Sequence, residues 1–431
     1  MLEESRDAIA AALETDPVEV ILTSGGTEAD NLAVKGLWEA RTAQDPSRRR
    51  VIVSSIEHPA VQEPAEHLSQ HCGAQLEVLE VDELGRTDPA QLKAMLARDP
   101  GSVALVAVMW ANNEVGTVQP IAELAEVCAE FQVPLHVDAV QALGALPISS
   151  RLPGLTTIAV SGHKIGAPVG SGALVVGRAA QIRPLLHGGG QQRGLRPGTL
   201  DAAGAAGFAA AVREATADLP EQARRLAQLR DRLIDGIRAD VPQAVLRGPL
   251  DRPHSGLRLP GNIHFTFPGC EGDSLLFLLD AAGFATSTGS ACTAGVPRPS
   301  RVLLAMGLDE RTARGAQRFT LGRGSTEADV DALVAALPQI HARPGRRALR
   351  RLSRRPTVVG QPGAAPGGHG CRRTATLEGR SGGPAGHRAP RSTVRRSPCA
   401  SWQPCPGEWT PPSRRRAPSR PGTTSPACTW P

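Results

Sequence analysis

The chain has 431 residues, 41% of them hydrophobic, and a net charge of +6, so it can bury a core and hold two or three domains. Residues 342–431 contain 18 arginines and two acids and carry +16, which leaves −10 on residues 1–341 and excludes nucleic-acid binding as the role of the whole chain. Its apolar runs fall short of the ~18 residues of a membrane span, and its eight cysteines lack CxxC spacing, which argues against zinc and disulfides and indicates a reducing, cytoplasmic setting.

Apolar runs alternate with helical patterns through residues 1–240. An amphipathic helix is predicted at 1–16. Strands are predicted at 18–24, 51–56, 76–81, 103–110, 133–140, 155–161 and 172–177, and a long helix over residues 200–240 follows them. This alternation predicts a large α/β domain with a mostly parallel sheet that helices cover on both faces.

Residues 241–341 have a different pattern, which predicts a smaller α+β domain. Its strands are expected at 262–267, 284–289 and 317–323, and its helices at 273–283, 300–307 and 327–337.

The C-terminal segment 342–431 has no Ile, Phe or Lys and is rich in Arg, Pro and Gly. Such a segment cannot bury enough apolar surface to offset its chain entropy, so we expect it to be disordered. Two interpretations of its origin stay open. The abrupt change of composition favours an out-of-frame translation, and the alternative is a basic arm that binds nucleic acid or an acidic partner.

The first motif, SGGTEADN, follows a predicted strand and begins a helix. Gly25, Gly26 and Thr27 would offer backbone N–H groups and a hydroxyl to a phosphate, and the alternative is an ordinary glycine-rich helix start. His58 follows the next strand, just before a helix that begins with proline. It could stack on a planar ligand or carry protons, or it could be a histidine of a surface turn.

Two later strands also end in polar residues. Asn113, in ANNEVG, is either a donor to a ring oxygen or a turn residue. Asp138 ends the strand HVDA, and Gln141 follows one short turn later. A buried carboxylate at that place could pair with a heterocyclic N–H⁺ group, and the alternative is a helix cap.

Lysine is rare in this chain, which has 45 arginines but only Lys35, Lys93 and Lys164. Lys164 lies in SGHKIGAPVGSG, at the end of a strand. A lysine amine can lose its proton and attack a carbonyl, whereas a guanidinium stays protonated. Lys164 is therefore the candidate for Schiff-base chemistry, because Lys35 and Lys93 fall on helices.

Two residues of the smaller domain complete the set. Cys292 lies in TSTGSACTAGVPRP, a stretch of small residues that suits an exposed, mobile thiol, whereas Cys72 and Cys128 are expected to be buried as small apolar groups. Arg318 lies in the apolar strand AQRFTLGR, where it is expected to face a site and hold a carboxylate through its two-pronged guanidinium. The alternative is an arginine in water on an edge strand.

These residues together match what pyridoxal phosphate requires. A phosphate-binding loop, a stacking histidine, a carboxylate for the ring nitrogen and a lysine amine would hold and orient the cofactor, which itself acts as the electron sink.

Residues 18–341 resemble the pyridoxal-phosphate cysteine desulfurases of the class V aminotransferase group. The matching motifs occur in the family's order: SGGTEADNLA, EHPAV, NNEVGTVQPI, HVDAVQ, SGHKIGAPVGSGAL, GGGQQRGLRPGTL, GSACTAG and RFTLGR. The resemblance implies fold type I of the pyridoxal-phosphate enzymes and a homodimer. The long segment around Cys292 is similar to the subgroup that supplies iron–sulfur cluster assembly and tRNA thiolation.

The resemblance also implies a role for each site residue. Lys164 forms the Schiff base and moves protons, and His58 stacks on the ring. Gly26, Thr27, Ser161 and His163 hold the phosphate, with Thr199 from the other subunit. Asp138 pairs with the ring nitrogen, and Asn113 and Gln141 flank the ring oxygen. Arg318, with Asn113, binds the carboxylate of L-cysteine. Cys292 takes the substrate sulfur as a persulfide, leaving L-alanine, and passes it to an acceptor protein; no resident metal is expected, although in relatives this cysteine transiently ligates an iron–sulfur cluster.

Two departures from the family leave alternatives open. Family members begin some tens of residues earlier, with a segment of the form L-D-N-A-A-T, and here the chain is expected to start inside the following helix. The C-terminal segment is the second departure.

Two alternative functions stay open. A selenocysteine lyase shares nearly every motif, and an inactive truncated relative would keep them without a complete pocket.

Overall fold

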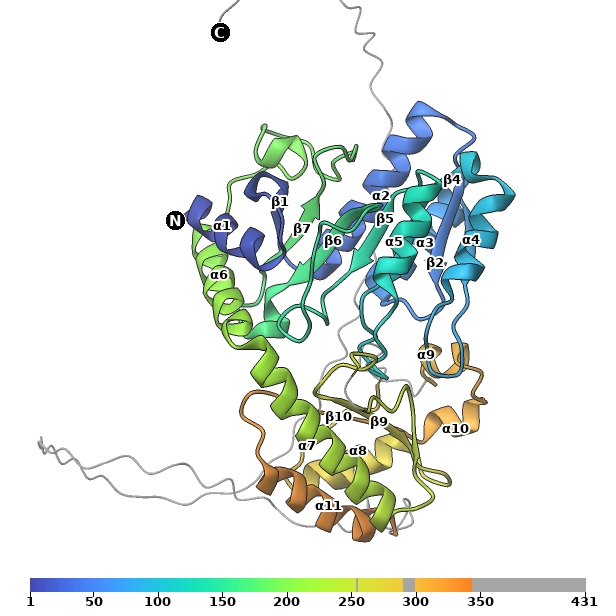
Figure 1. Cartoon of the computed structure of the whole chain (residues 1–431), viewed down its shortest axis with the longest axis vertical. Coiled ribbons are helices and arrows are strands. Elements are labelled where there is room, and N and C mark those ends of the chain that lie inside the picture. The colour runs from blue at the N-terminus through green and yellow to red at the C-terminus, as the bar shows by residue number, and fades with distance from the viewer. Residues whose placement is uncertain (253–254, 290–298, 343–431) are drawn as a thin grey trace, which may run out of the picture. The chain divides into compact units, whose positions relative to one another are not determined.

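A computed structural model of the chain describes residues 1–252, 255–289 and 299–342, which all belong to one compact unit. Within these residues the chain forms a seven-stranded and a three-stranded sheet with helices around them (Figure 1). Cys292 and the segment from residue 343 onward lie outside the described residues, so the disorder expected of that segment stays a prediction.

The seven-stranded sheet has the order β1-β7-β6-β5-β4-β2-β3. Its strands are β1 (Val20–Thr23), β2 (Arg50–Ser54), β3 (Gln75–Leu79), β4 (Val103–Met109), β5 (Leu135–Asp138), β6 (Leu155–Ser161) and β7 (Gly172–Val176). The pairs from β3 through β6 are parallel, and β7 is antiparallel to both β6 and β1. The mostly parallel sheet expected from the sequence is therefore confirmed, and β1 points in the same direction as β6.

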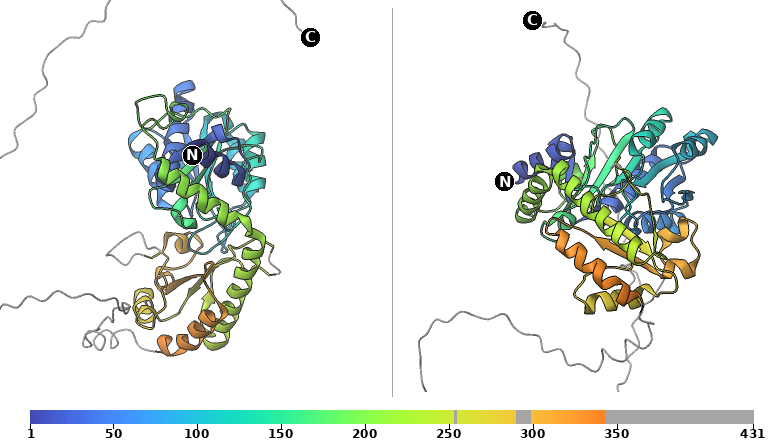
Figure 2. Two further views of the ribbon diagram at one scale, coloured as in Figure 1. Left: turned by 90° about the vertical axis from the view of Figure 1, so that its left-hand side faces the viewer. Right: turned by 60° about the horizontal axis from the view of Figure 1, so that its bottom comes forward.

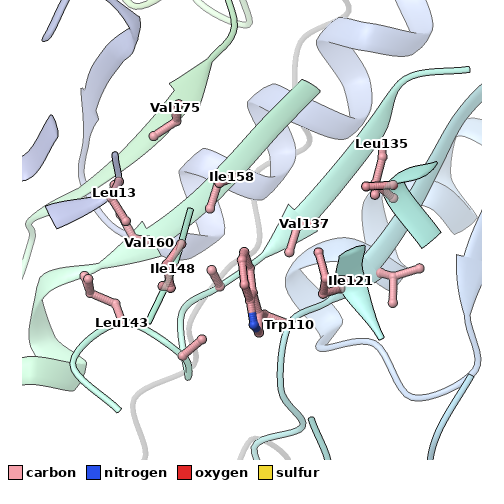
Figure 3. Close-up of a cluster of buried hydrophobic side chains, with 14 of the residues drawn as sticks. Leu13, Trp110, Ile121, Leu135, Val137, Leu143, Ile148, Ile158, Val160 and Val175 are labelled. Atoms are coloured by element: carbon pink, nitrogen blue, oxygen red, sulfur yellow. The ribbon is translucent and has the colours of Figure 1, made fainter. Parts of the chain in front are cut away.

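Each face of this sheet buries its own apolar core because side chains alternate between the faces. Ile52 and Val106 belong to one core, and their neighbours Val53 and Leu105 belong to the other. Figure 3 shows part of the first core. The helices on that face are α1 (Leu2–Ala12), α4 (Pro89–Arg98), α5 (Ile121–Glu130) and α6 (Ala202–Ala217), and those on the other are α2 (Gly26–Gln44) and α3 (Pro59–His71).

The long helix expected over residues 200–240 is instead two helices. α6 ends at Ala217, and α7 (Leu219–Asp240) begins two residues later. Pro220 explains the break, because a proline lacks the N–H group and fits an α-helix only in its first turn. Both side views show α7 continuing away from α6 (Figure 2).

The three-stranded sheet has the order β10-β9-β8 and two unlike faces. Ile263, Phe265 and Phe319 belong to a buried core with residues of the helices around it, whereas His264 and Arg318 lie opposite each other on the second face. Its strands are β8 (Val245–Leu246), β9 (Asn262–Thr266) and β10 (Ala316–Thr320), and the helices of that core are α7, α8 (Gly272–Ala281) and α11 (Glu327–His341). The domain boundary expected at residue 240 stays a prediction.

Three local predictions were wrong or incomplete. The strand expected at 284–289 forms only an isolated bridge from Ser287 to Arg318, because Gly283 and Gly289, both with φ of 92°, turn the chain on either side. The short elements β8 and α10 (Glu310–Arg314) were not predicted, whereas the helix expected at 300–307 is confirmed as α9 (Arg301–Ala305). Cys128 is buried as expected, but Cys72 is exposed because it follows the last turn of α3.

Four 3₁₀ turns complete the described elements: Pro17–Glu19, Pro100–Ser102, Gly162–Ile165 and Gln192–Gly194. Across the described ranges, no helix is both long enough and apolar enough to span a bilayer.

Leu105→Ala should destabilise the fold strongly. Leu105 is completely buried in β4, so its truncation loses apolar contact and leaves a cavity, with an expected cost of about 2–5 kcal/mol in the free energy of unfolding. Leu84→Ala is the matched control, since that side chain is 43% exposed and its loss should cost under about 0.5 kcal/mol. Urea unfolding followed by circular dichroism measures both, and equal losses would contradict the assignment of the core.

Candidate active site

The site forms where parallel strands end. Because β1, β2, β4, β5 and β6 point the same way, their carboxyl ends lie at one edge of the sheet. Ligands of open α/β sheets bind at that edge. Gly25, His58 and Asn113 follow three of these strands, and Asp138 and Ser161 are the last residues of two others. The topology therefore brings together residues that the sequence analysis selected one motif at a time.

The turn at Gly25 and Gly26 is built for close approach. Gly25 has a φ of 147°, which favours glycine, and a Cβ on Gly26 would stand 2.7 Å from Cγ2 of Val140. The turn lies against the end of β6 as well, since a Cβ on Gly25 would be 3.8 Å from Oγ of Ser161. Gly26 begins α2, and the backbone N–H groups of that first turn, beside the exposed Thr27, are of the kind that bind anions at helix N-termini.

Ser161 and His163 extend this cradle. The Ser161 hydroxyl and Nδ1 of His163 are 2.7 Å apart. Partial burial lowers the pKa of His163, and the neighbouring charge of Lys164 lowers it further. A neutral imidazole can accept the hydroxyl proton or donate one to an oxyanion, so this pair suits a phosphate.

Asp138 is a buried carboxyl group at the end of β5. It is 5% exposed, and its Oδ1 accepts a hydrogen bond of 2.9 Å from the N–H of Val140. Burial raises the pKa of Asp138 to about 7, and the nearby Asp30 adds to the rise, whereas His58 and His136 oppose it. A cation that binds beside Asp138 would therefore stabilise its ionised form and lower its pKa.

His58 caps the N-terminus of α3. Its Nδ1 accepts a hydrogen bond of 3.1 Å from the N–H of Ala60, so in the neutral ring the proton is on Nε2. Burial lowers the pKa of His58, Asp138 acts against that shift, and Lys164 adds to it. His58 is thus near both Asp138 and Lys164 and is held as a flat neutral ring.

Lys164 lies in the 3₁₀ turn that follows β6, with an exposed side chain. Its charge lowers the pKa of both His58 and His163, so it lies near both rings. The sequence analysis set Lys93 aside, and that side chain forms an ion pair of 2.7 Å with Glu130 on the surface of α4 and α5. Lys164 is therefore the lysine amine that this edge of the sheet presents.

Arg318 reaches this edge from the three-stranded sheet. Its Nη1 donates a hydrogen bond of 2.8 Å to the backbone carbonyl oxygen of Asn113. Arg318 is therefore half-buried against the turn after β4 and is not an arginine in open water, while its role at a site stays a prediction. Asn113 and Gln141 are both half-buried in the turns that follow β4 and β5.

Thr199 has no contact with the other site residues among the described hydrogen bonds, and its loop is held elsewhere. Thr199 is exposed in a loop that also contains Gln192. The side chain of Gln192 accepts a hydrogen bond of 2.6 Å from the N–H of Leu22 and donates one of 2.9 Å to the carbonyl oxygen of Leu22. Arg196 of that loop pairs with Glu28 in the first turn of α2 at 2.9 Å. The contribution of Thr199 to another subunit stays a prediction. Cys292 is outside the described residues.

The sequence analysis missed four buried polar residues around the site. Glu114 accepts a hydrogen bond of 2.5 Å from Ser300 Oγ and would be 2.9 Å from a Cβ on Gly289, so it contacts both ends of the segment that contains Cys292. Glu57, Asp30 and His136 lie near Asp138, since Asp30 and His136 shift the pKa of Asp138 and Asp138 raises that of Glu57. The available signal was a polar letter inside an apolar pattern, as for His136 in VPLHVDAV.

The residues present fit pyridoxal phosphate. The Gly25–Gly26 turn forms a cradle that a Cβ would fill, with hydroxyl and N–H donors for a phosphate. A buried carboxyl group for a ring nitrogen, a flat imidazole and a lysine amine lie along the same edge. Together they match the three chemical groups of that cofactor, an anion, a basic aromatic nitrogen and an aldehyde.

Comparisons with known proteins agree with this geometry. The model of the aminotransferase class-V family matches residues 1–333. An IscS-like cysteine desulfurase of Mycobacterium tuberculosis is 50% identical over 348 residues, which cover 81% of this chain and 87% of that protein. A solved NifS-like protein matches with a TM-score of 0.71 and 33% identity over 79% of this chain and 87% of its own. A structure titled SspA in complex with cysteine matches with a TM-score of 0.62 and 31% identity, over 74% and 86%.

The expected fold is therefore confirmed. The α/β fold with a mostly parallel large sheet and a smaller α+β part is that of the NifS-like structures.

Asp138→Asn should change how stability depends on pH. The carboxyl of Asp138 has a pKa of about 7 in the folded chain against an ordinary 3.8, so between these values the folded chain holds a proton that the unfolded chain has lost. The free energy of unfolding therefore falls as the pH rises through this window. Between pH 4 and pH 7, the free energy of unfolding of the ligand-free variant should therefore fall by about 1–4 kcal/mol less than that of the ligand-free wild type. Urea unfolding at several pH values measures this.

Asp88→Asn is the control for that series. Asp88 is an exposed cap of α4, and its asparagine variant still caps, so it should follow the wild-type pH dependence. An unchanged pH dependence in Asp138→Asn would contradict the buried, proton-holding state of Asp138.

Proposed function

This chain belongs to the cysteine desulfurases of the class-V aminotransferase family, and we propose that it removes sulfur from L-cysteine with pyridoxal phosphate as its cofactor. One observation carries the proposal: Lys164, Asp138, His58 and the Gly26 turn gather at one edge of the sheet, and Arg318 reaches the same edge. The matching structure that holds cysteine supports the same substrate. Neither a selenocysteine lyase nor an inactive relative is favoured by these relatives.

Each polar group at the edge would hold one part of the cofactor. Gly26, Thr27, Ser161 and His163 would bind the phosphate, and Asp138 the protonated ring nitrogen. Asn113 and Gln141 would flank the ring oxygen, and His58 would stack on the ring. When bound, pyridoxal phosphate supplies an aldehyde for amines and a ring that withdraws electrons from the substrate carbon. Lys164 would hold the aldehyde and move protons with its amine.

Arg318 would orient the substrate. Its guanidinium is anchored to the carbonyl oxygen of Asn113, so the remaining N–H groups have a defined direction. A guanidinium can bind a carboxylate through two parallel hydrogen bonds, which fixes both position and angle. We assign it, with Asn113, to the carboxylate of L-cysteine.

Cys292 would accept the sulfur. The Cβ–S bond of L-cysteine breaks, an S–S bond forms to the Cys292 sulfur, and the carbon gains a proton, so L-alanine and a Cys292 persulfide result. The attacking group must be a thiolate. The sulfane sulfur would then pass to an acceptor protein of iron–sulfur cluster assembly or tRNA thiolation. A homodimer, with Thr199 reaching the partner's phosphate, completes the proposal.

The decisive test combines the visible spectrum with product analysis. The purified full chain should show a cofactor band that changes on adding L-cysteine, and it should release L-alanine. Lys164→Ala should lose the band, because the amine that holds the aldehyde is gone. Cys292→Ser should keep the band but form no L-alanine. A wild-type chain that stays colourless with added pyridoxal phosphate would refute the proposed activity.

Arg318→Lys should weaken substrate use without loss of the cofactor band. Lysine keeps the charge but loses the fork, and a hydrogen bond to a charged group contributes about 1.5–3 kcal/mol, so kcat/KM for L-cysteine should fall roughly 10- to 100-fold, mostly through KM. Arg301→Lys, whose side chain is 65% exposed, serves as the control. An unchanged KM in Arg318→Lys would remove Arg318 from the substrate site.

A further inference from the structure

Three buried carboxyl groups lie together beneath the proposed ring site. Asp30 is 1% exposed, Glu57 6% and Asp138 5%. Asp30 lies in the second turn of α2, Glu57 follows β2, and Asp138 ends β5. The groups are close enough to act on one another, because Asp30 raises the pKa of Asp138 and both raise that of Glu57. Within the described part of the chain, none of the three forms an ion pair with lysine or arginine.

Asp30 has a neutral partner. Its Oδ1 lies 3.2 Å from Nε2 of His136, and Nδ1 of that histidine lies 2.9 Å from Oγ1 of Thr157. Burial lowers the pKa of His136 to about 4, so the imidazole is neutral at neutral pH and cannot balance a charge on Asp30. Because Asp30 is sealed between α2 and the sheet, ionising it would leave an unpaired buried charge. The favourable state is a protonated Asp30 beside a neutral His136.

Glu57 has hydrogen bonds to one oxygen only. Its Oε1 accepts from Ser54 Oγ at 2.5 Å and from the N–H of Met109 at 2.7 Å. Its Oε2 is buried and, among the described residues, meets no donor. A carboxylate would need donors at both oxygens, whereas a carboxylic acid carries its proton on the second oxygen. The one-sided hydrogen bonding therefore indicates a protonated Glu57.

Asp138 differs from the other two because it has access to a cation. It faces the edge of the sheet where His58 and Lys164 lie, and in the proposed function it meets the ring N–H⁺ group of the cofactor. Glu63, on α3, also raises the pKa of His58. A single negative charge in the cluster is thus most stable on Asp138.

We propose that Asp30 and Glu57 stay protonated in the folded enzyme and thereby leave the single negative charge of this cluster on Asp138, where it pairs with the cofactor ring nitrogen. Asp30 and Glu57 are positioning residues in this scheme, since they act through Asp138. They fill the space beneath it with neutral groups, so no second carboxylate competes for the ring proton. The inference rests on the proposed function only for the identity of the cation.

Infrared spectroscopy tests the protonation directly. In the full-length holoenzyme at neutral pH, buried protonated carboxyl groups absorb in a C=O stretching region separate from that of carboxylates. The wild type should show such bands, shifted in D₂O. Asp30→Asn should lose one band and Glu57→Gln a different one, whereas Asp138→Asn and the exposed control Asp88→Asn should lose none. A wild-type spectrum without such bands, or a band lost in Asp138→Asn instead, would overturn the proposal, and the wild-type result does not depend on how any variant folds.

Cofactor affinity supplies the second readout. Titration with pyridoxal phosphate should give nearly wild-type dissociation constants for Asp30→Asn and Glu57→Gln, because each replaces a neutral acid by a neutral amide of similar shape. Asp138→Asn should bind at least about tenfold more weakly, since it loses a hydrogen bond to a charged group. Equal weakening in all three variants would contradict the assignment of the charge. Failure of the proposed function would appear as a wild type that shows no cofactor band and forms no L-alanine. Failure of the protonation proposal would appear in the infrared bands, which do not depend on the cofactor.

Discussion

The common direction of β1, β2, β4, β5 and β6 is the constraint on which the site depends. Parallel pairing of β2, β4, β5 and β6, and two antiparallel pairings through β7 for β1, send the segments that follow these strands to one edge, so side chains from distant parts of the sequence meet there. The register is held by the apolar alternation, because a slip of one residue would turn Ile52 and Val53 to the wrong faces. The strand register that packs the two cores therefore also sets the positions of the residues at the strand ends.

Charge is distributed sparingly beneath this edge. The structure buries three carboxyl groups there, of which Glu57 bonds to Ser54 and Asp30 to His136, and Thr157 bonds in turn to the other nitrogen of His136. A buried charge without a partner is costly, and of the three groups Asp138 is the one that faces the edge where His58 and Lys164 lie. In the proposed scheme, the charge at this edge therefore depends on burial as much as on the identity of Asp138.

The three-stranded sheet contributes through its two unlike faces. Its apolar face packs on α7, α8 and α11, and its other face carries Arg318. Gly116 lets the turn after β4 approach this face, since a Cβ there would stand 2.6 Å from Oδ1 of Asn262. The same turn offers the carbonyl oxygen of Asn113 to Arg318. The close packing against β9 and the anchoring of Arg318 thus depend on the same turn.

Local patterns were enough to predict most strands and the residues that end them. Lys164 and Asp138 could be selected because each follows an apolar run, and strand ends are readable from composition. The sequence could not show that residues 284–289 form only a bridge, since that depends on two turning glycines and on a neighbour far along the chain. It also merged α6 with α7, where a single proline decides the break.

The sequence by itself determined the fold class, the family motifs and the chemical identity of the groups at the strand ends, because these depend on residue type and short-range spacing. Only the tertiary structure decided that Asp30, Glu57 and Glu114 belong to the neighbourhood of the site. Their role depends on burial and on partners from other segments, and a carboxyl group has no fixed protonation state until its surroundings are formed.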